Sequence, residues 1–186
     1  VAPQTQQALF AYGNTGSVSS LKNLVNSSGV IAADVTGVGT ARKNLAAATY
    51  GIDKAIFGYG NSGSRTGITN LVNSSGVVAA DTAGVGTARE YLAAAKYGGD
   101  KALFAYGNTG SLSSLKNLVS NTGVVAADVT GVGTARYILA AVGYGSSGQA
   151  IFGYGYTSGN VSMTNLVGST GTIGSDVTGV GTARNG

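Results

Sequence analysis

The segment GVGTAR at residues 84–89 decides how this chain is organised, because the same six letters occur four times in the sequence. The four occurrences end at Arg42, Arg89, Arg136 and Arg184, so they are spaced 47 or 48 residues apart. An internal period of this length is typical of propellers, solenoids and other repeat arrays. The chain is therefore interpreted as four tandem copies of one unit.

Two further features recur in the same register. One is an acidic residue that precedes each GVGTAR segment, at Asp34, Asp81, Asp128 and Asp176. The other is an aromatic segment, ALFAYG or AIFGYG, at residues 8–13, 55–60, 102–107 and 150–155. Because a whole pattern repeats, and not one motif alone, each copy is expected to fold in the same way.

Each copy divides into short apolar runs separated by turn residues. In the second copy the runs lie at 45–48, 54–59, 68–72 and 77–80, and the crossing to the next copy spans 81–87. Strict alternation would place Ile56 and Gly58 on one face of the second run, and Phe57 and Tyr59 on the other. The turn at 73–76 (NSSG) is typical of a tight hairpin, because Asn and Gly tolerate positive φ.

The alanine-rich runs, at 45–48 and 92–95 among others, leave an alternative open. Alanine favours helix, but a run this short between glycine-rich loops is not viable as an isolated helix. We expect these runs to be the innermost strands, where small side chains allow neighbouring copies to converge.

Four short strands in each unit of about 40–50 residues is typical of a β-propeller blade. The fold prediction is therefore an all-β propeller that forms one repeat domain over residues 1–186, with four-stranded blades at about 1–42, 43–89, 90–136 and 137–186. The alternative is a β-solenoid-like repeat array, although solenoid rungs are usually shorter.

The order of Arg42, the run LAAA at 45–48 and the segment AIFGYG at 55–60 resembles the kelch-type repeat. That family has a basic residue before its inner strand and a glycine doublet after its second strand. Here Tyr59 splits the doublet, and the chain has no tryptophan. The resemblance implies a propeller. The chain is also similar to the Gly- and Ala-rich repeats of tailed-phage and marine metagenomic virion proteins, which implies a virion-associated or extracellular location.

The first copy begins almost at its aromatic segment, so most of its inner alanine strand is missing. A closed propeller needs its first and last blades sealed. Three alternatives are open: the ring tolerates a gap, a neighbouring subunit supplies the strand, or the chain is a segment of a longer array. We hypothesise that another subunit supplies it at an open sheet edge, the kind of edge at which strand addition occurs.

The composition argues against catalysis. The chain has no His and no Cys, which removes the commonest general base and one class of nucleophile. Its seven acidic residues include the four repeated aspartates, which would lie around a ring without forming an acid–base pair. The 11 basic residues form no run or stripe, so no nucleic-acid binding is expected. No apolar run is long enough to span a membrane as a helix.

The repeated acidic and basic residues are expected to form structural pairs along or between blades (Asp34, Arg42, Asp81, Arg89, Asp128, Arg136, Asp176 and Arg184). A calcium or phosphate site in residues 81–87 is the weaker alternative. Each loop offers one carboxylate, whereas Ca²⁺ takes about six to eight oxygens, and a lone Gly-x-Gly pair is a weak phosphate signal. The prediction is no metal and no cofactor.

The polar loop between the second and third strands is the candidate ligand site, because loops on a rigid scaffold commonly carry recognition. Its candidate residues suit polyhydroxyl ligands and are Asn14, Ser17, Asn61, Arg65, Asn108, Ser111, Tyr156 and Asn160. The repeated Phe and Tyr residues could form sugar-stacking platforms, but packing between blades is the favoured interpretation.

These features together predict a non-enzymatic structural or assembly module of a virion or extracellular appendage, which associates with itself or with another structural subunit. The first alternative is a multivalent carbohydrate-binding propeller whose partners are surface glycans. The second is a designed repeat protein.

Overall fold

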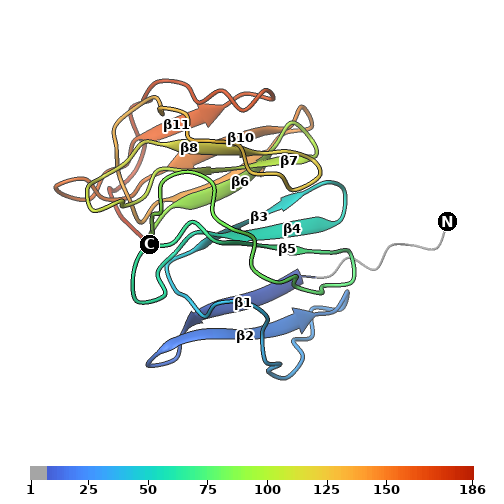
Figure 1. The fold of residues 1–186 in the computed structure, drawn as a ribbon. Coiled ribbons are helices and arrows are strands. Elements are labelled where there is room, and N and C mark those ends of the chain that lie inside the picture. The colour runs from blue at the N-terminus through green and yellow to red at the C-terminus, as the bar shows by residue number, and fades with distance from the viewer. Residues whose placement is uncertain (1–7) are drawn as a thin grey trace.

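The computed structural model of the chain describes residues 8–186 and is all-β over that range, with no helix (Figure 1). Its eleven strands form four small antiparallel sheets, one in each copy. The first sheet contains β1 (Ala8–Asn14) and β2 (Val18–Val25), and the second contains β3 (Ala46–Tyr50), β4 (Lys54–Gly58) and β5 (Thr69–Val72). The third contains β6 (Ala93–Tyr97), β7 (Lys101–Ala105) and β8 (Lys116–Val119), and the fourth contains β9 (Ala140–Tyr144), β10 (Gln149–Gly153) and β11 (Thr164–Val167).

The alanine-rich runs are strands, as predicted, and the helical alternative is wrong. In the second sheet Ala46 pairs with Gly58 and Tyr50 pairs with Lys54, so β3 lies antiparallel beside β4. The sequence also predicts that the first copy lacks most of its inner alanine strand. That prediction concerns residues before Ala8, which lie outside the described residues.

The prediction of four strands in each copy is wrong, because the fourth run forms isolated bridges and not a strand. In the second copy these bridges join Val72 to Val78 and Thr69 to Thr82. The physical reason is a side chain that replaces part of the ladder: the Asn70 amide donates to the carbonyl oxygen of Ala79, at 3.0 Å. A backbone acceptor used in this way no longer needs a strand partner.

The four sheets follow one another in chain order, with the first and fourth at opposite ends of the array (Figure 1). Neighbouring sheets contact one another chiefly through the inner strands, where β3 lies against β6 and β6 against β9. Alanine side chains at these strands permit the close approach. Each sheet is a separate hydrogen-bonded unit, so residues 8–186 contain no closed sheet.

Three apolar clusters fill the spaces between neighbouring sheets. In each, a tyrosine of one copy packs against a phenylalanine of the next, edge-on in the first two and tilted in the third. The ring centroids are 5.4 Å apart for Tyr12 and Phe57, and 5.1 Å apart for Tyr59 and Phe104. Tyr106 and Phe152 are 5.5 Å apart. The prediction that these aromatic residues pack between copies is confirmed for the three internal contacts.

The predicted alternation along 54–59 fails at its last residue. Phe57 faces the first sheet, whereas Tyr59 faces the third. The cause is the backbone of Tyr59, which adopts φ = 63°, a left-handed conformation that reverses the expected side-chain direction. The equivalent residues Tyr12, Tyr106 and Tyr154 share this conformation. In the first three copies this tyrosine therefore reaches forward to the next copy.

The first glycine of each GVGTAR segment permits a close approach of two backbone segments. A Cβ atom added to Gly131 would lie 1.5 Å from the carbonyl oxygen of Ser114, and one added to Gly84 would lie 2.5 Å from the carbonyl carbon of Gly67. No side chain fits at such distances without movement of the backbone. This glycine fixes the crossing against the loop of its own copy.

We expect Gly131→Ala to lower the free energy of unfolding by about 1–3 kcal/mol, because the added methyl group overpacks the crossing. Gly159→Ala is the matched control, since a Cβ atom there meets nothing within 4 Å. Urea unfolding in dilute solution, followed by circular dichroism, compares the two variants. Equal stability of the two would contradict the assigned role of Gly131.

Candidate functional site

The repeated arginines lie on the rings of the repeated tyrosines. The distance from the guanidinium carbon to the ring centroid is 4.2 Å for Arg42 over Tyr12 and 4.2 Å for Arg89 over Tyr59. The third and fourth pairs, Arg136 over Tyr106 and Arg184 over Tyr154, have distances of 4.3 and 3.7 Å. Arg42, Arg89 and Arg136 are fully buried. A desolvated cation over an aromatic face contributes about 2 kcal/mol.

Each buried arginine also bonds to the copy that follows it. Arg42 Nε donates to the carbonyl oxygen of Tyr59, at 2.9 Å, and Arg136 Nε makes the equivalent bond to Tyr154, at 2.9 Å. Arg89 instead donates through Nη2 to Asn117 Oδ1, at 2.6 Å. One guanidinium therefore links two consecutive copies at every internal junction.

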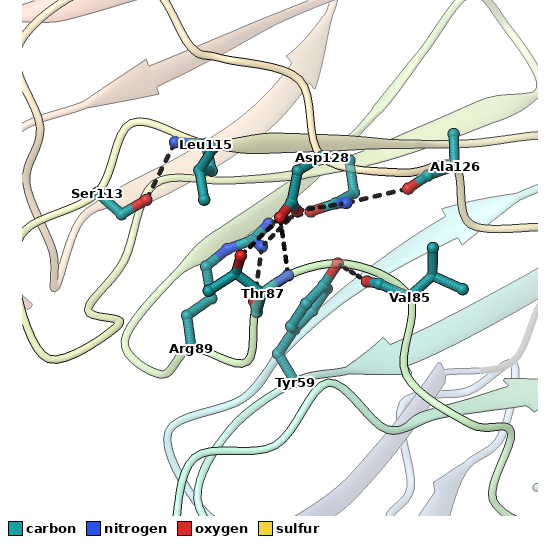
Figure 2. A network of polar contacts seen from close by, with 9 residues as sticks. Tyr59, Val85, Thr87, Arg89, Ser113, Leu115, Ala126 and Asp128 are labelled. Atoms are coloured by element: carbon teal, nitrogen blue, oxygen red, sulfur yellow. Dashed lines mark hydrogen bonds and ion pairs between the residues drawn. The ribbon is translucent and has the colours of Figure 1, made fainter.

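The repeated aspartates complete this link. Asp128 Oδ2 accepts hydrogen bonds from the backbone N and the Oγ1 of Thr87, at 2.8 and 2.7 Å, and Asp128 Oδ1 accepts one from Asn117 Nδ2, at 3.0 Å (Figure 2). Arg89 Nη1 lies 3.7 Å from the same carboxylate. Figure 2 also shows Tyr59 donating its hydroxyl to the carbonyl oxygen of Val85, at 3.1 Å. Thr87 and Arg89 belong to one copy, whereas Asp128 belongs to the next.

The same arrangement occurs at the other two internal junctions. Asp81 accepts from Thr40 and Asn70, and Asp176 accepts from Thr134 and Asn165. We call each set of Tyr, Thr and Arg with the Asn and Asp of the next copy a junction network. The aspartate of each network belongs to the following copy. It is not the repeated aspartate of the same copy, which lies eight residues before the arginine.

The junction networks shift the ionisation of their members. Burial opposes the charged form of Asp81, but hydrogen bonds from the Thr40 side chain, the Asn70 amide and the Thr40 backbone outweigh it and lower the pKa of the carboxyl. The pKa values of Asp128 and Asp176 are lowered in the same way. Burial raises the pKa of Tyr59 to about 12, although the positive charge of Arg89 acts in the opposite direction.

Sequence reasoning missed two members of the network, the threonine of GVGTAR and the asparagine of the third strand. Both recur at the repeat period, as Thr40, Thr87, Thr134 and Thr182 and as Asn23, Asn70, Asn117 and Asn165. The period was therefore a signal that could have found them. The partner copy could not be inferred from the period.

The candidate loop residues do not all gather in one site, but two of them meet at one carboxylate: Asn61 Nδ2 donates to Glu90 Oε2, at 3.2 Å, and Arg65 pairs with the same side chain. Asn14, Asn61 and Asn108 each accept a hydrogen bond from the backbone two residues ahead, at 3.2, 2.9 and 2.7 Å, which closes the loop on itself. The carbonyl oxygens of Ser17 and Ser111 accept bonds within the same loops.

The remaining candidate residues contact residues of other loops. Arg65 Nε lies 3.3 Å from Glu90 Oε1, and Asn160 Oδ1 accepts a bond from Asn185 at 2.8 Å. Tyr156 stacks edge-on against Tyr137, with ring centroids 5.7 Å apart.

An open groove of about 700 Å³ lies elsewhere. It runs along β3, β6 and β9 and is lined mostly by alanine, glycine and other small residues. None of the candidate loop residues lines it. Within residues 8–186 no three acidic, His or Cys side chains gather as metal ligands, and no helix of that range is long and apolar enough to span a bilayer.

No protein-family model matches the chain, and a search of curated proteins finds no match.

We expect Arg89→Met to lower the free energy of unfolding by about 3–5 kcal/mol, because removing one partner of a buried charged network leaves the others uncompensated. Arg65→Met is the control. Its arginine side chain is 37% exposed, and its partner Glu90 keeps hydrogen bonds from Asn44 and Asn61 when Arg65 is replaced, so we expect a smaller loss than at Arg89, which is fully buried. Chemical denaturation in dilute solution measures both. A loss at Arg89 no larger than that at Arg65 would contradict the network.

The lowered pKa values of Asp81, Asp128 and Asp176 predict acid sensitivity. Because the folded carboxyls hold their protons less tightly than the unfolded ones, their stabilisation is present above about pH 4 and is lost as the pH falls through the folded pKa values. Melting temperature measured from pH 7 to pH 2 should fall below about pH 4. Asp128→Asn should show a shallower fall, and an unchanged slope would refute the assignment.

Proposed function

We propose that this chain is a non-enzymatic structural module and that several molecules of it associate into a larger assembly. The observation that carries the proposal is the junction network, which recurs between the four copies and engages the repeated polar residues in holding one copy to the next. A surface built to bind a small molecule would instead direct such residues into a cavity.

The distribution of ionisable groups supports a non-catalytic role. Three of the repeated aspartates, Asp81, Asp128 and Asp176, are each bound to a threonine of the preceding copy and lie one repeat apart. With no His or Cys in the sequence, a catalytic site would need a convergent set of carboxylates or amines. The described part of the chain contains no cluster of three or more such acidic groups.

We further propose that the array is an arc of a β-propeller and not a β-solenoid. Two observations support this. Neighbouring sheets contact one another mainly through β3, β6 and β9, and the alanines of these inner strands suit convergence toward an axis. The groove along the same three strands would then border the central channel. The kelch resemblance adds to this support.

A virion or extracellular appendage is the proposed location. The low content of charged residues, 10%, and the recurring pattern of the four copies suit a packed, repetitive particle. The similarity to repeats of virion proteins points in the same direction.

Carbohydrate binding is the second candidate, and one observation favours it. Tyr91, Tyr137 and Tyr156 form a row of edge-on contacts, with centroid separations of 5.8 and 5.7 Å, beside the candidate loops. Tyrosine rings with polar neighbours are suitable platforms for sugar rings.

The test is the solution mass, measured by light scattering over a wide range of concentration. The proposed function predicts a mass that rises above the 18.2 kDa of one chain as concentration increases. A constant monomer mass would overturn the assembly proposal. Glycan-array binding by that monomer, abolished in Tyr156→Ala, would then favour carbohydrate binding.

A further inference from the structure

The three internal junctions join two different faces of the repeat. The face toward the next copy, here the donor face, presents the tyrosine, threonine and arginine of the network. The face toward the preceding copy, the acceptor face, presents the phenylalanine, asparagine and aspartate. At the third junction Tyr106, Thr134 and Arg136 of the donor face meet Phe152 and Asp176 of the acceptor face.

The first sheet leaves its acceptor face open. Phe10 is 61% exposed, whereas the equivalent Phe152 is 0% exposed. Ile31 is 58% exposed, against 2% for the equivalent Ile173. Asp34 accepts one hydrogen bond, from Asn23 at 2.8 Å, and within residues 8–186 no threonine or arginine reaches it.

The fourth sheet leaves its donor face open. Tyr144 is 41% exposed, although the equivalent Tyr97 is 3% exposed and packs against Gly171 of the next copy. Val180 is 89% exposed. Arg184 is exposed, whereas its three equivalents are fully buried. No other part of the described chain covers this face.

Both open faces already hold the geometry of an internal junction. Asn23 holds Asp34 as Asn70 holds Asp81, at 2.8 and 2.9 Å. Arg184 lies 3.7 Å from the ring centroid of Tyr154, whose hydroxyl donates to Val180, at 3.2 Å. Groups that are preorganised before contact lose little freedom on binding.

We propose that the donor face of the fourth sheet binds the acceptor face of the first sheet of a second copy of this chain, head to tail. The contact repeats the internal junctions: Thr182 donates to Asp34, Arg184 becomes buried over Tyr154, and Tyr154 packs against Phe10. This inference rests on the proposed assembly function and specifies its interface. It requires no exchange of strands.

The complementarity is specific for a donor–acceptor pair. Two acceptor faces would bring Asp34 against Asp34, and two donor faces would bring Arg184 against Arg184, so like charges oppose both self-pairings. The two open faces lie at opposite ends of the array (Figure 1). A heterologous contact of this kind generates a ring if its rotation closes and a filament if it does not.

The test uses two variants of the full chain that each block one face. Phe10→Glu places a carboxylate on the acceptor face, and Arg184→Glu places one against Asp34. Both positions are exposed in the monomer, so folding is expected to be retained. The matched controls are Ile52→Glu, at a position 93% exposed in a hairpin turn, and Lys54→Glu, at another exposed position.

Sedimentation equilibrium of each protein alone, and of the two blocked variants mixed in equal amounts, gives the decisive result. Each blocked variant should associate at least about thirtyfold more weakly than the wild type. Arg184→Glu removes one partner of a buried charged contact, and Phe10→Glu places an unpaired carboxylate in an apolar contact. The two controls should associate as the wild type does. The mixture should form a heterodimer and nothing larger, since it retains one intact face of each kind.

The outcomes separate the two proposals. If the wild type associates but the blocked variants associate equally well, or if their mixture forms no dimer, the head-to-tail interface is wrong and the assembly function stands. If the wild type stays monomeric at every concentration, the assembly function itself is wrong and the interface falls with it.

Discussion

The structure depends on a guanidinium group buried between two copies. Removing an arginine from water costs several kcal/mol, so each of these side chains needs compensation from its surroundings. Tyr59 supplies an aromatic face for Arg89, Asn117 supplies an acceptor, and Asp128 supplies a negative charge that Thr87 holds in place. These groups come from two copies. Neither copy alone can bury its arginine, which makes association between copies a condition of the fold.

This dependence gives the molecule the character of a one-dimensional array, in which each unit is stabilised mainly by its neighbours. The aromatic contact and the polar network lie at the same boundary between copies. Tyr59 packs against Phe104, and the guanidinium group of Arg89 lies over a face of the Tyr59 ring. The left-handed backbone of Tyr59 makes both contacts possible. The same boundary has no partner at either end of the array, so the chemistry that holds the copies together also marks the two surfaces suited to further association.

Much of the fold could be predicted from the sequence, because period and turn chemistry are local properties. The alanine runs are strands, the turn at 73–76 is a hairpin, and the aromatic residues pack between copies. The direction of Tyr59 could not be predicted, since alternation assumes an extended backbone and this residue has φ = 63°. The prediction of a fourth strand was wrong for a related reason: the Asn70 side chain donates to the carbonyl oxygen of Ala79, an acceptor that a regular strand ladder would use. The candidate loops were correctly seen as polar, but their asparagines close turns and do not meet in a common site.

The sequence by itself determined the unit, its length, its all-β character and the set of residues that recur, because each of these follows from a pattern read along one chain. Only the tertiary structure decided which copy supplies the partner of each residue. Asp81 follows Arg42 by 39 positions, and Asp34 precedes it by eight. Both aspartates occupy the same position of the repeat, so the sequence does not show which of them is the partner of Arg42. Packing distinguishes them: the sheets stack in chain order, so Thr40 and Arg42 face the second sheet, where Asp81 lies within hydrogen-bonding distance of Thr40. The aspartate left over, Asp34, lies on the face that the array leaves open, where Asn23 is its one side-chain partner among the described residues.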